Sequence, residues 1–432
     1  MWRRCGRRYT PNIMEGPLIS VYIPTNGRPE LEYAIDSILN QDIPGVEIVV
    51  SSCAKQEEVA RLIRRYNNPL IKNAPLPEGM PTNGTFDYAA RHTTGRYIFF
   101  LSDDDCFLPG ALALMVTVAR STGADLVAGN HLYFYDNRHA RRYLRHAMGV
   151  VPYTGTTRTF NPFQAIRAFF AFDRIGPKHQ IPRLHPSTIM VERGVMERAW
   201  KQIGTIMFDD LPNGLSHQPI LLAHAQRCVS VDYPVVIVGR LGVSMSQVWS
   251  TAARNRFRTT PFPLEYSPVI GYTRINGSLE NYLRLQKRYP EVFGDIPINY
   301  NVFARIYVQE LRYLDMEWNM MVPVWRDAFA FLRTLPEPVR TELIAKARRF
   351  ALLYPVVFVA RRTGLHHLWR VLLGRRIAAR APSPAVEFAH KREFYIPLVK
   401  YPTVRTISDV AANAFSILRH EIGQGLPPAP SI

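Results

Sequence analysis

The segment Tyr97-Ile-Phe-Phe-Leu-Ser-Asp103-Asp104-Asp105-Cys-Phe-Leu-Pro109 joins an apolar run, typical of a buried strand, directly to three consecutive carboxylates. Adjacent ionised Asp side chains repel one another, so their position at the end of such a strand calls for a compensating cation. The helical spacing after Pro109 leaves a second interpretation, in which the carboxylates cap a helix. The surrounding sequence decides between a metal–diphosphate site and a helix cap.

Composition describes a folded, basic protein. The chain has 432 residues, 47% of them hydrophobic, which is enough for two or three domains with real cores and excludes a disordered protein. Its 53 Lys and Arg against 35 Asp and Glu give a net charge of +18. This excess favours an anionic partner such as a membrane surface, a nucleotide or a nucleic acid.

Cysteine usage and hydropathy favour a cytoplasmic protein. The four cysteines are widely separated and form no CxxC pair, so neither a disulfide framework nor a zinc site is expected: Cys5, Cys53, Cys106 and Cys228. The basic N-terminus is not followed by the apolar core of a signal peptide. The longest apolar segment, 350–360, is too short to span a bilayer, so we expect any membrane contact to be peripheral, on the cytoplasmic face.

Strand and helix signals alternate from residue 18 onward. We expect strands at 18–23, 46–50, 97–101 and 125–128, and helices at 31–39, 57–66, 85–93 and 108–121. Such alternation predicts a mostly parallel sheet covered by helices on both faces. Ligands bind at the carboxyl ends of strands in these sheets, where Pro24 to Arg28, Ser51 and Asp103 to Asp105 all fall.

The character of the sequence changes near residue 251, where stripes of helical spacing replace the alternation. We predict an extension at 1–16, an α/β domain at 17–250, a mainly helical basic region at 251–422 and a flexible tail at 423–432. The segment 340–380 carries ten basic residues against one acid, interleaved with large apolar residues. This pattern suits contact with an anionic membrane, although a solvated basic surface is the plainer alternative.

Four segments, in this order, resemble the family 2 glycosyltransferases of the GT-A fold: 19–30 (ISVYIPTNGRPE), 34–41 (AIDSILNQ), 46–50 (VEIVV) and 94–111 (TGRYIFFLSDDDCFLPGA). Their order and spacing are far more specific than any one of them. The resemblance implies an α/β GT-A fold, with a Rossmann-like, mostly parallel sheet flanked by helices. It also implies an inverting hexosyltransferase that moves a sugar from a nucleotide-diphosphate sugar to an acceptor hydroxyl.

The resemblance assigns roles to the acidic triplet. A divalent cation, Mn²⁺ or Mg²⁺, would neutralise the leaving diphosphate, and it takes oxygen ligands. Asp104 is the first choice for metal contact and Asp105 the second, while Asp103 faces the ribose or the β-phosphate. The leading Asp of the family motif is here Ser102, a weaker ligand.

The donor site departs from the family pattern in a second way. By resemblance, the loop Pro24-Thr25-Asn26 wraps the base and ribose, and Arg28 is a counter-charge for the phosphates. The family often places Asp residues just after the second strand, whereas this chain has Ser51-Ser52-Cys53. We therefore expect hydroxyls and backbone groups to read the base, with a UDP-sugar as the default donor.

An inverting transfer also needs a general base, usually a carboxylate in this family. The resemblance favours Asp210 first and Asp209 second, each of which could instead be a solvated turn residue. A second alignment places Ser216, His217 and Gln218 at the acidic pair before an apolar helix, making His217 a candidate base or else a core or capping histidine. His185, at the head of a strand at 188–191, is a weaker candidate for the acceptor cleft.

We expect the first of three function classes and keep the other two as alternatives, with no nucleic-acid partner expected. The first is a glycosyltransferase that uses a glycan or lipid-linked acceptor to build a cell-envelope polysaccharide or glycolipid. The second is a catalytically inactive GT-A scaffold, motivated by Ser51, Ser52 and Ser102 in place of acids. The third is a nucleic-acid-binding protein, which the charge allows but which lacks a recognisable reading motif.

Overall fold

The computed structural model of the chain describes residues 16–77, 80, 84–139, 144–173, 181–182, 184–207, 216–241, 264–270, 273–313, 318–363 and 394–422. The strands are β1 (Ile19–Thr25), β2 (Val46–Ser52), β3 (Ile71–Asn73), β4 (Tyr97–Phe100), β5 (Cys106–Phe107), β6 (Leu126–Tyr135), β7 (Ala147–Val150), β8 (Thr157–Phe160), β9 (Ile189–Glu192), β10 (Cys228–Arg240) and β11 (Phe394–Pro397). The helices are α1 (Leu31–Leu39), α2 (Gln56–Tyr66), α3 (Gly84–Arg91), α4 (Ala111–Thr122), α5 (Pro162–Phe170), α6 (Arg193–Ile203), α7 (His217–His224), α9 (Arg274–Arg288), α10 (Pro290–Phe293), α11 (Tyr300–Tyr313), α12 (Trp318–Arg333), α13 (Val339–Arg362) and α16 (Ile407–Ile422), with 3₁₀ turns η3 (Pro186–Thr188) and η4 (Leu398–Lys400).

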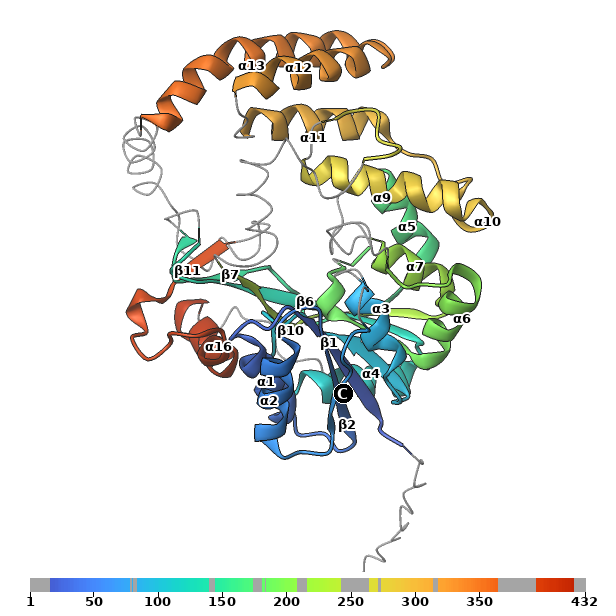
Figure 1. Cartoon of the computed structure of the whole chain (residues 1–432), viewed down its shortest axis with the longest axis vertical. Helices are drawn as coiled ribbons and strands as arrows, with labels where there is room; N and C mark the ends of the chain where they lie inside the picture. Colours follow the sequence, from blue (N-terminus) through green and yellow to red (C-terminus); the bar gives the residue numbers. More distant parts are fainter. Residues whose placement is uncertain are drawn as a thin grey trace, which may run out of the picture.

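A single sheet of 11 strands organises the protein, with the main order β11-β7-β6-β9-β4-β1-β2-β3 (Figure 1). The strands β2, β1 and β4 run parallel, as the alternating sequence pattern predicts. β3, which the sequence analysis did not predict, adds a further parallel strand beside β2. The next strand, β9, runs antiparallel to β4. β6, on the other side of β9, runs antiparallel to β9. The predicted α/β class is confirmed, and its parallel half carries the loops of the expected ligand site.

Helices cover both faces of this sheet because its strands are apolar on both sides. All seven residues of β1 are buried, and they alternate between two cores. Val21 packs with α1, α2 and α4 on one face, whereas Tyr22 packs with α3, α5, α6 and α7 on the other. A strand buried on both faces reads as a continuous apolar run, which is why the sequence located β1 and β2 so closely.

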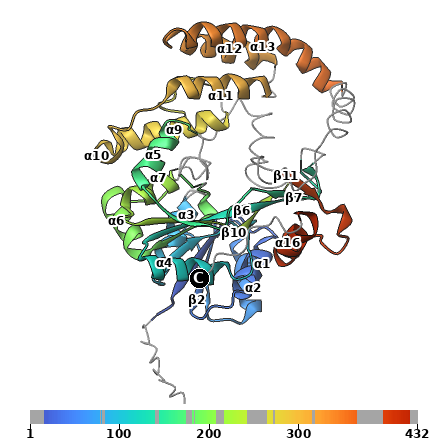
Figure 2. The ribbon, with the colours of Figure 1, turned by 180° about the vertical axis from the view of Figure 1, so that it is seen from behind.

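A layer of helices follows, as expected for the region after residue 251. The described members of the predicted stripes are buried in a core of their own, formed by α9, α11, α12 and α13: Phe303, Tyr307, Leu311, Val324, Ala328, Phe331 and Leu335. The helix α9 belongs to two cores, since Tyr282 and Leu285 pack toward the sheet while Leu279 and Leu283 pack toward α11. Figure 2 shows α12 and α13 as the outermost layer, far from β2 and β3.

The chain then returns to the sheet, which the sequence did not predict. β11 pairs antiparallel with β7, and α16 packs against α1, β5 and β10. The division into domains therefore stays a prediction, but residues 394–422 complete a core of the α/β part. Only Phe394 and Ile396 alternate as buried positions in β11, a pattern too short to identify a strand from sequence.

We expect Leu418→Ala to destabilise the α/β part. Leu418 is fully buried in the core that α16 shares with the sheet, so truncation should lower the free energy of unfolding by about 2–5 kcal/mol. Urea unfolding followed by circular dichroism measures this change. Ser416→Ala, at an exposed position of the same helix, is the control and should stay within about 0.5 kcal/mol of wild type. Equal stability of the two variants would show that α16 is dispensable.

Candidate functional site

The carboxyl ends of β1, β2 and β4 meet at one edge of the sheet, because the strands are parallel and in register. Thr25 lies opposite Ser52, and Tyr22 lies opposite Phe100. The Thr25 hydroxyl donates a 2.7 Å hydrogen bond to Asp103 Oδ2 and accepts one of 2.9 Å from the Gly27 N–H. Gly27 has a φ of 78°, and a Cβ there would lie 2.8 Å from Lys55 Cβ, so this turn requires glycine.

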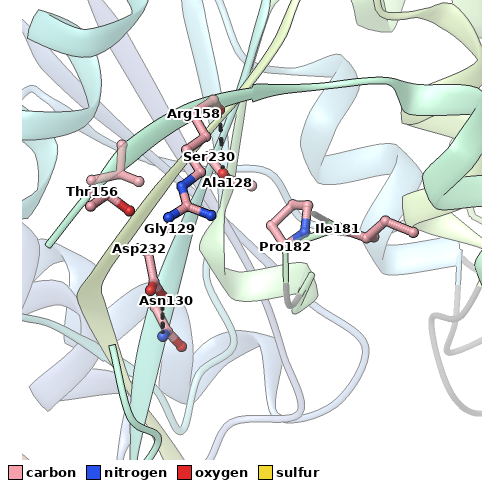
Figure 3. A pocket seen from close by; sticks show the side chains of 10 residues that line it. Ala128, Gly129, Asn130, Thr156, Arg158, Ile181, Pro182, Ser230 and Asp232 are labelled. Atoms are coloured by element: carbon pink, nitrogen blue, oxygen red, sulfur yellow. Dashed lines mark hydrogen bonds between the residues drawn. The ribbon is translucent and has the colours of Figure 1, made fainter. Parts of the chain in front are cut away.

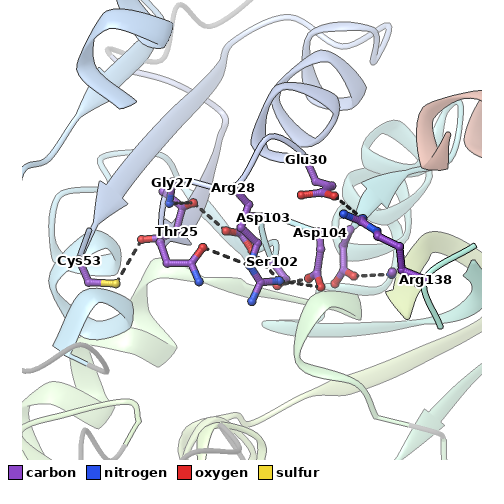
Figure 4. A network of polar contacts seen from close by, with 12 residues as sticks. Thr25, Gly27, Arg28, Glu30, Cys53, Ser102, Asp103, Asp104 and Arg138 are labelled. Carbon is purple, nitrogen blue, oxygen red and sulfur yellow. Dashed lines mark hydrogen bonds and ion pairs between the residues drawn. The ribbon is translucent and has the colours of Figure 1, made fainter. Parts of the chain in front are cut away.

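Arg28 holds two of the three carboxylates together. Its Nη1 lies 3.1 Å from Asp104 Oδ2 and 3.9 Å from Asp103 Oδ1 (Figure 4). Its Nε donates to Asn26 Oδ1 at 3.1 Å, and the Ser102 hydroxyl donates to Asp104 Oδ1 at 2.7 Å. The Arg28 and Asp104 side chains are only 11% and 9% exposed, so the pair is poorly screened by water.

Burial raises the pKa values of two carboxylates of the triplet. Burial, together with the charge of Asp104, raises the pKa of Asp103 to about 6. The same two causes raise the pKa of Asp105 well above its usual value. Asp105 Oδ1 accepts a 2.9 Å hydrogen bond from the Gly239 N–H, whereas its buried Oδ2 has no hydrogen-bond partner within the described residues. The site thus holds more acidic oxygen than its own donors satisfy.

These carboxylates fit a divalent cation that arrives with a phosphate ligand. The described part of the chain contains no group of three or more His, Cys, Asp or Glu side chains arranged for a metal. Mg²⁺, however, is commonly held by one or two carboxylates together with substrate phosphates rather than by a protein cage. Asp104 and the unpartnered oxygen of Asp105 would supply that smaller set of oxygen ligands to such a cation.

The predicted base-reading serines lie deeper than expected. The Ser51 and Ser52 side chains are buried, with exposed fractions of 0% and 1%. The Ser52 hydroxyl is hydrogen bonded to the Ala54 carbonyl, and the Ser51 hydroxyl has no partner among the described residues. Pro24 is buried as well, whereas Asn26 is partly exposed. Among these predicted donor contacts, Asn26 and Arg28 are the side chains with access to a ligand.

Arg240, which the sequence analysis did not identify, extends the site across the sheet. It ends β10, its guanidinium lies 4.8 Å from the centre of the Tyr133 ring, and its charge acts on Asp105. The His185 ring lies beside His131 at 5.2 Å, and burial, with the charge of Arg240, lowers the pKa of His185 to about 3. The position of Arg240, just after the apolar run of β10, is the sequence signal that could have identified it.

A second ion-pair group, which the sequence analysis did not predict, borders the triplet. Arg138 lies 2.9 Å from Glu30 Oε1 and 2.5 Å from Asp136 Oδ2, and so links the start of α1 to the end of β6. Figure 4 shows this group beside Asp104, with Arg28 on the other side. Cationic side chains therefore border the carboxylates from two elements that lie far apart in the sequence.

The structure describes only one of the candidate general bases, His217. Asp209 and Asp210 lie outside the described residues. His217 is buried with an exposed fraction of 0%, where its Nε2 lies 3.2 Å from the Tyr22 hydroxyl and its ring packs edge-on against Phe100. Burial lowers the pKa of His217 to about 4. This is the environment of a core histidine at the start of α7, so we do not retain His217 as a general base.

A small pocket lies elsewhere, between β6, β8 and β10 (Figure 3). It is lined by Asn130, Arg158 and Asp232 among others, and Asn130 donates a 2.9 Å hydrogen bond to Asp232. A volume of about 30 Å³ holds one or two water molecules. The pocket is therefore too small for a sugar nucleotide and is separate from the acidic triplet.

Comparison with known proteins identifies the domain that carries this geometry. The family model for "Glycosyl transferase family 2" matches residues 20–198, which include β1 except its first residue, β2, β4 and the whole triplet. Over these residues the chain is similar to the family 2 glycosyltransferases. A similar protein is GalNAc(5)-diNAcBac-PP-undecaprenol beta-1,3-glucosyltransferase of Campylobacter jejuni, 34% identical over 122 residues. That match covers 27% of this chain and 38% of the relative.

Two solved structures resemble the chain at low identity. TarS 1-349 of S. aureus, in complex with UDP-GlcNAc, is 15% identical with a TM-score of 0.43, covering 80% of this chain and 92% of that one. The mannosyltransferase PcManGT of Pyrobaculum calidifontis, in complex with GDP-Man and Mn²⁺, is 16% identical with a TM-score of 0.35, covering 80% and 87%. With TM-scores this low, the fold assignment rests on the observed strand order and on the family-model match to residues 20–198.

We predict that His217→Gln reduces the loss of stability at acid pH. The folded state keeps His217 neutral down to a pKa of about 4, whereas the unfolded chain takes up the proton near the ordinary value of 6.5. Wild type should therefore lose stability relative to the variant as the pH falls from about 6.5 to 4. Urea unfolding across this range measures the difference. A difference that does not change with pH would mean that the folded ring titrates normally.

A second prediction concerns the cation that Arg28 supplies. In Arg28→Gln, Asp104 loses its positive partner, so Mn²⁺ should bind the nucleotide-free protein about five-fold more tightly, the equivalent of roughly 1 kcal/mol. Electron paramagnetic resonance of free Mn²⁺ measures this binding directly. Arg96→Gln, which removes an ion pair with Glu192 at the opposite end of β4 from the triplet, is the control. Weaker Mn²⁺ binding in Arg28→Gln would contradict competition between the guanidinium and the metal.

Proposed function

We propose that this protein is a glycosyltransferase that moves a sugar from a nucleotide-diphosphate sugar to an acceptor hydroxyl. The observation that carries the proposal is the buried triplet Asp103–Asp105, located at the carboxyl edge of the parallel strands within a family 2 domain. Thr25 and Arg28 meet the triplet there from a separate loop. An acidic cluster with a neighbouring guanidinium suits a charged diphosphate better than a neutral ligand.

Donor binding would rearrange the charges around Arg28. In the described structure this guanidinium neutralises Asp104, and it lies on a partly exposed turn next to Asn26. A diphosphate brings oxygen acceptors that compete for the same N–H donors, so Arg28 would turn from the carboxylate to the phosphates. Asp103, held by Thr25, stays in place to accept hydrogen bonds from the ribose.

A bound Mn²⁺ or Mg²⁺, held by Asp104 and Asp105, would neutralise negative charge on the leaving diphosphate. The protein's own groups then serve the acceptor. In an inverting displacement, the acceptor oxygen bonds to the anomeric carbon as the bond to the diphosphate breaks, and a carboxylate takes the hydroxyl proton. Asp210, with Asp209 as second choice, is proposed for that role from its place in the sequence.

The acceptor and setting are proposed from one relative. The printed name of the Campylobacter protein describes a lipid-linked acceptor, and we infer a glycan or lipid-linked acceptor here as well, in cell-envelope synthesis at the cytoplasmic face of the membrane. None of the described helices has the length and hydropathy of a membrane span. A UDP-sugar remains the default donor.

Two variants separate donor binding from transfer. Asp104→Asn should abolish Mn²⁺-dependent binding of UDP-sugars and lower turnover on the order of a hundred-fold or more. Asp210→Asn should retain donor binding while turnover falls by at least about a hundred-fold, as for loss of a general base. Calorimetric titration with UDP-sugars and release of UDP measure the two effects.

Each outcome bears on the proposal. Near-normal activity of Asp104→Asn would overturn the assigned metal site. A wild-type protein that binds no sugar nucleotide and releases no nucleotide across a donor panel would favour the inactive scaffold, which Ser102 in place of the leading Asp first suggested.

A further inference from the structure

The helix α13 exposes an apolar surface where a solvent-facing helix should be polar. Its inner face is an ordinary core stripe, with Leu343, Ala347 and Tyr354 buried against α11 and α12. Its outer face begins as expected, with Glu342, Arg348 and Arg349 exposed. One turn later the exposed residues become aliphatic: Leu352, Leu353, Val356 and Val359, with exposed fractions of 79%, 52%, 66% and 55%.

These four side chains form one stripe, which we call the α13 patch. Positions 352, 356 and 359 recur at helical spacing, and 353 lies beside them, so they share one side of the helix. Figures 1 and 2 show α13 in the outermost layer, on the side away from the sheet. No other described element therefore packs against the patch. Clustered exposed aliphatic residues usually mark an interaction site.

The charge around the patch indicates which partner covers it. Arg348 and Arg349 precede it directly on the exposed face. The sequence from 343 to 386 contains nine Lys or Arg residues and no Asp or Glu. A second copy of the chain would bring an equally basic segment against this one, and like charges at that distance repel. An anionic surface instead gains from both the aliphatic and the basic side chains.

We propose that the α13 patch docks the protein onto an anionic lipid surface. The aliphatic side chains enter the headgroup–acyl boundary, while Arg348 and Arg349 contact lipid phosphates at the adjoining turn. The helix lies in the interface and does not cross it, which agrees with the hydropathy of the described helices. This proposal deepens the envelope setting proposed above, but it does not depend on sugar transfer.

Vesicle sedimentation at low salt tests the patch. Wild type should bind vesicles that contain phosphatidylglycerol and bind pure phosphatidylcholine vesicles much less. Leu352→Glu/Val356→Glu should weaken binding to the anionic vesicles about ten-fold or more. Leu70→Glu/Val399→Glu makes the same change of charge and polarity at exposed aliphatic residues outside α13 and should bind like wild type. Arg348→Gln/Arg349→Gln should weaken binding to anionic vesicles only.

Three results would overturn the proposal. The first is a wild-type protein that does not bind anionic vesicles. The second is equal vesicle binding by Leu352→Glu/Val356→Glu and its matched control Leu70→Glu/Val399→Glu. The third is a dimer, measured by sedimentation equilibrium, that only Leu352→Glu/Val356→Glu dissociates, since the patch would then be an interface between copies. Binding of a UDP-sugar should be unchanged in both Glu variants, so loss of vesicle binding and failure of the transferase assignment remain distinguishable.

Discussion

Three acidic side chains packed at low exposure are the constraint on which this structure depends. Their charges cannot all persist in a buried position without compensation, and the chain supplies that compensation from several distant segments. Thr25 ends β1, Arg28 lies in the turn that follows, and the Gly239 N–H comes from β10. The loop after β4 is therefore held by both halves of the sheet, and the excess acidic oxygen is what a diphosphate-bound cation would use.

The C-terminal return supports the same site indirectly. β5 follows the triplet immediately, and it pairs with β10, which carries Gly239 and Arg240. α16 packs on both of these strands and on α1. Gly239 leaves no room for a side chain, since a Cβ would lie 2.0 Å from the Asp104 carbonyl oxygen. α16, about 300 positions beyond the triplet, thus supports the strands that position the triplet. The first 250 residues of the sequence therefore do not contain every element that shapes the site.

Prediction from sequence succeeded where the signal was local. Continuous apolar runs located β1, β2 and β4. The side chains predicted directly after them, Asp103, Asp104, Thr25 and Arg28, lie together at one edge of the sheet, while their roles stay predictions. It failed where the determining contact was long-range. β11 is a strand only because β7 offers an edge, and Arg240 joins the site only because β10 lies beside β6. His217 had the position of a base in one alignment, but Tyr22 and Phe100 enclose it. Asp209 and Asp210 stay predictions.

The double membership of α9 has a geometric consequence. Because this helix contributes side chains to the sheet core and to the outer helical core, the two layers share a common interior and cannot tilt freely against each other. If α13 rests on a bilayer, the height and inclination of the carboxylate edge above the lipid are then fixed by the fold. An acceptor tethered in that bilayer would be selected by its reach, with chains shorter or longer than this height presenting their terminal hydroxyl at the wrong level.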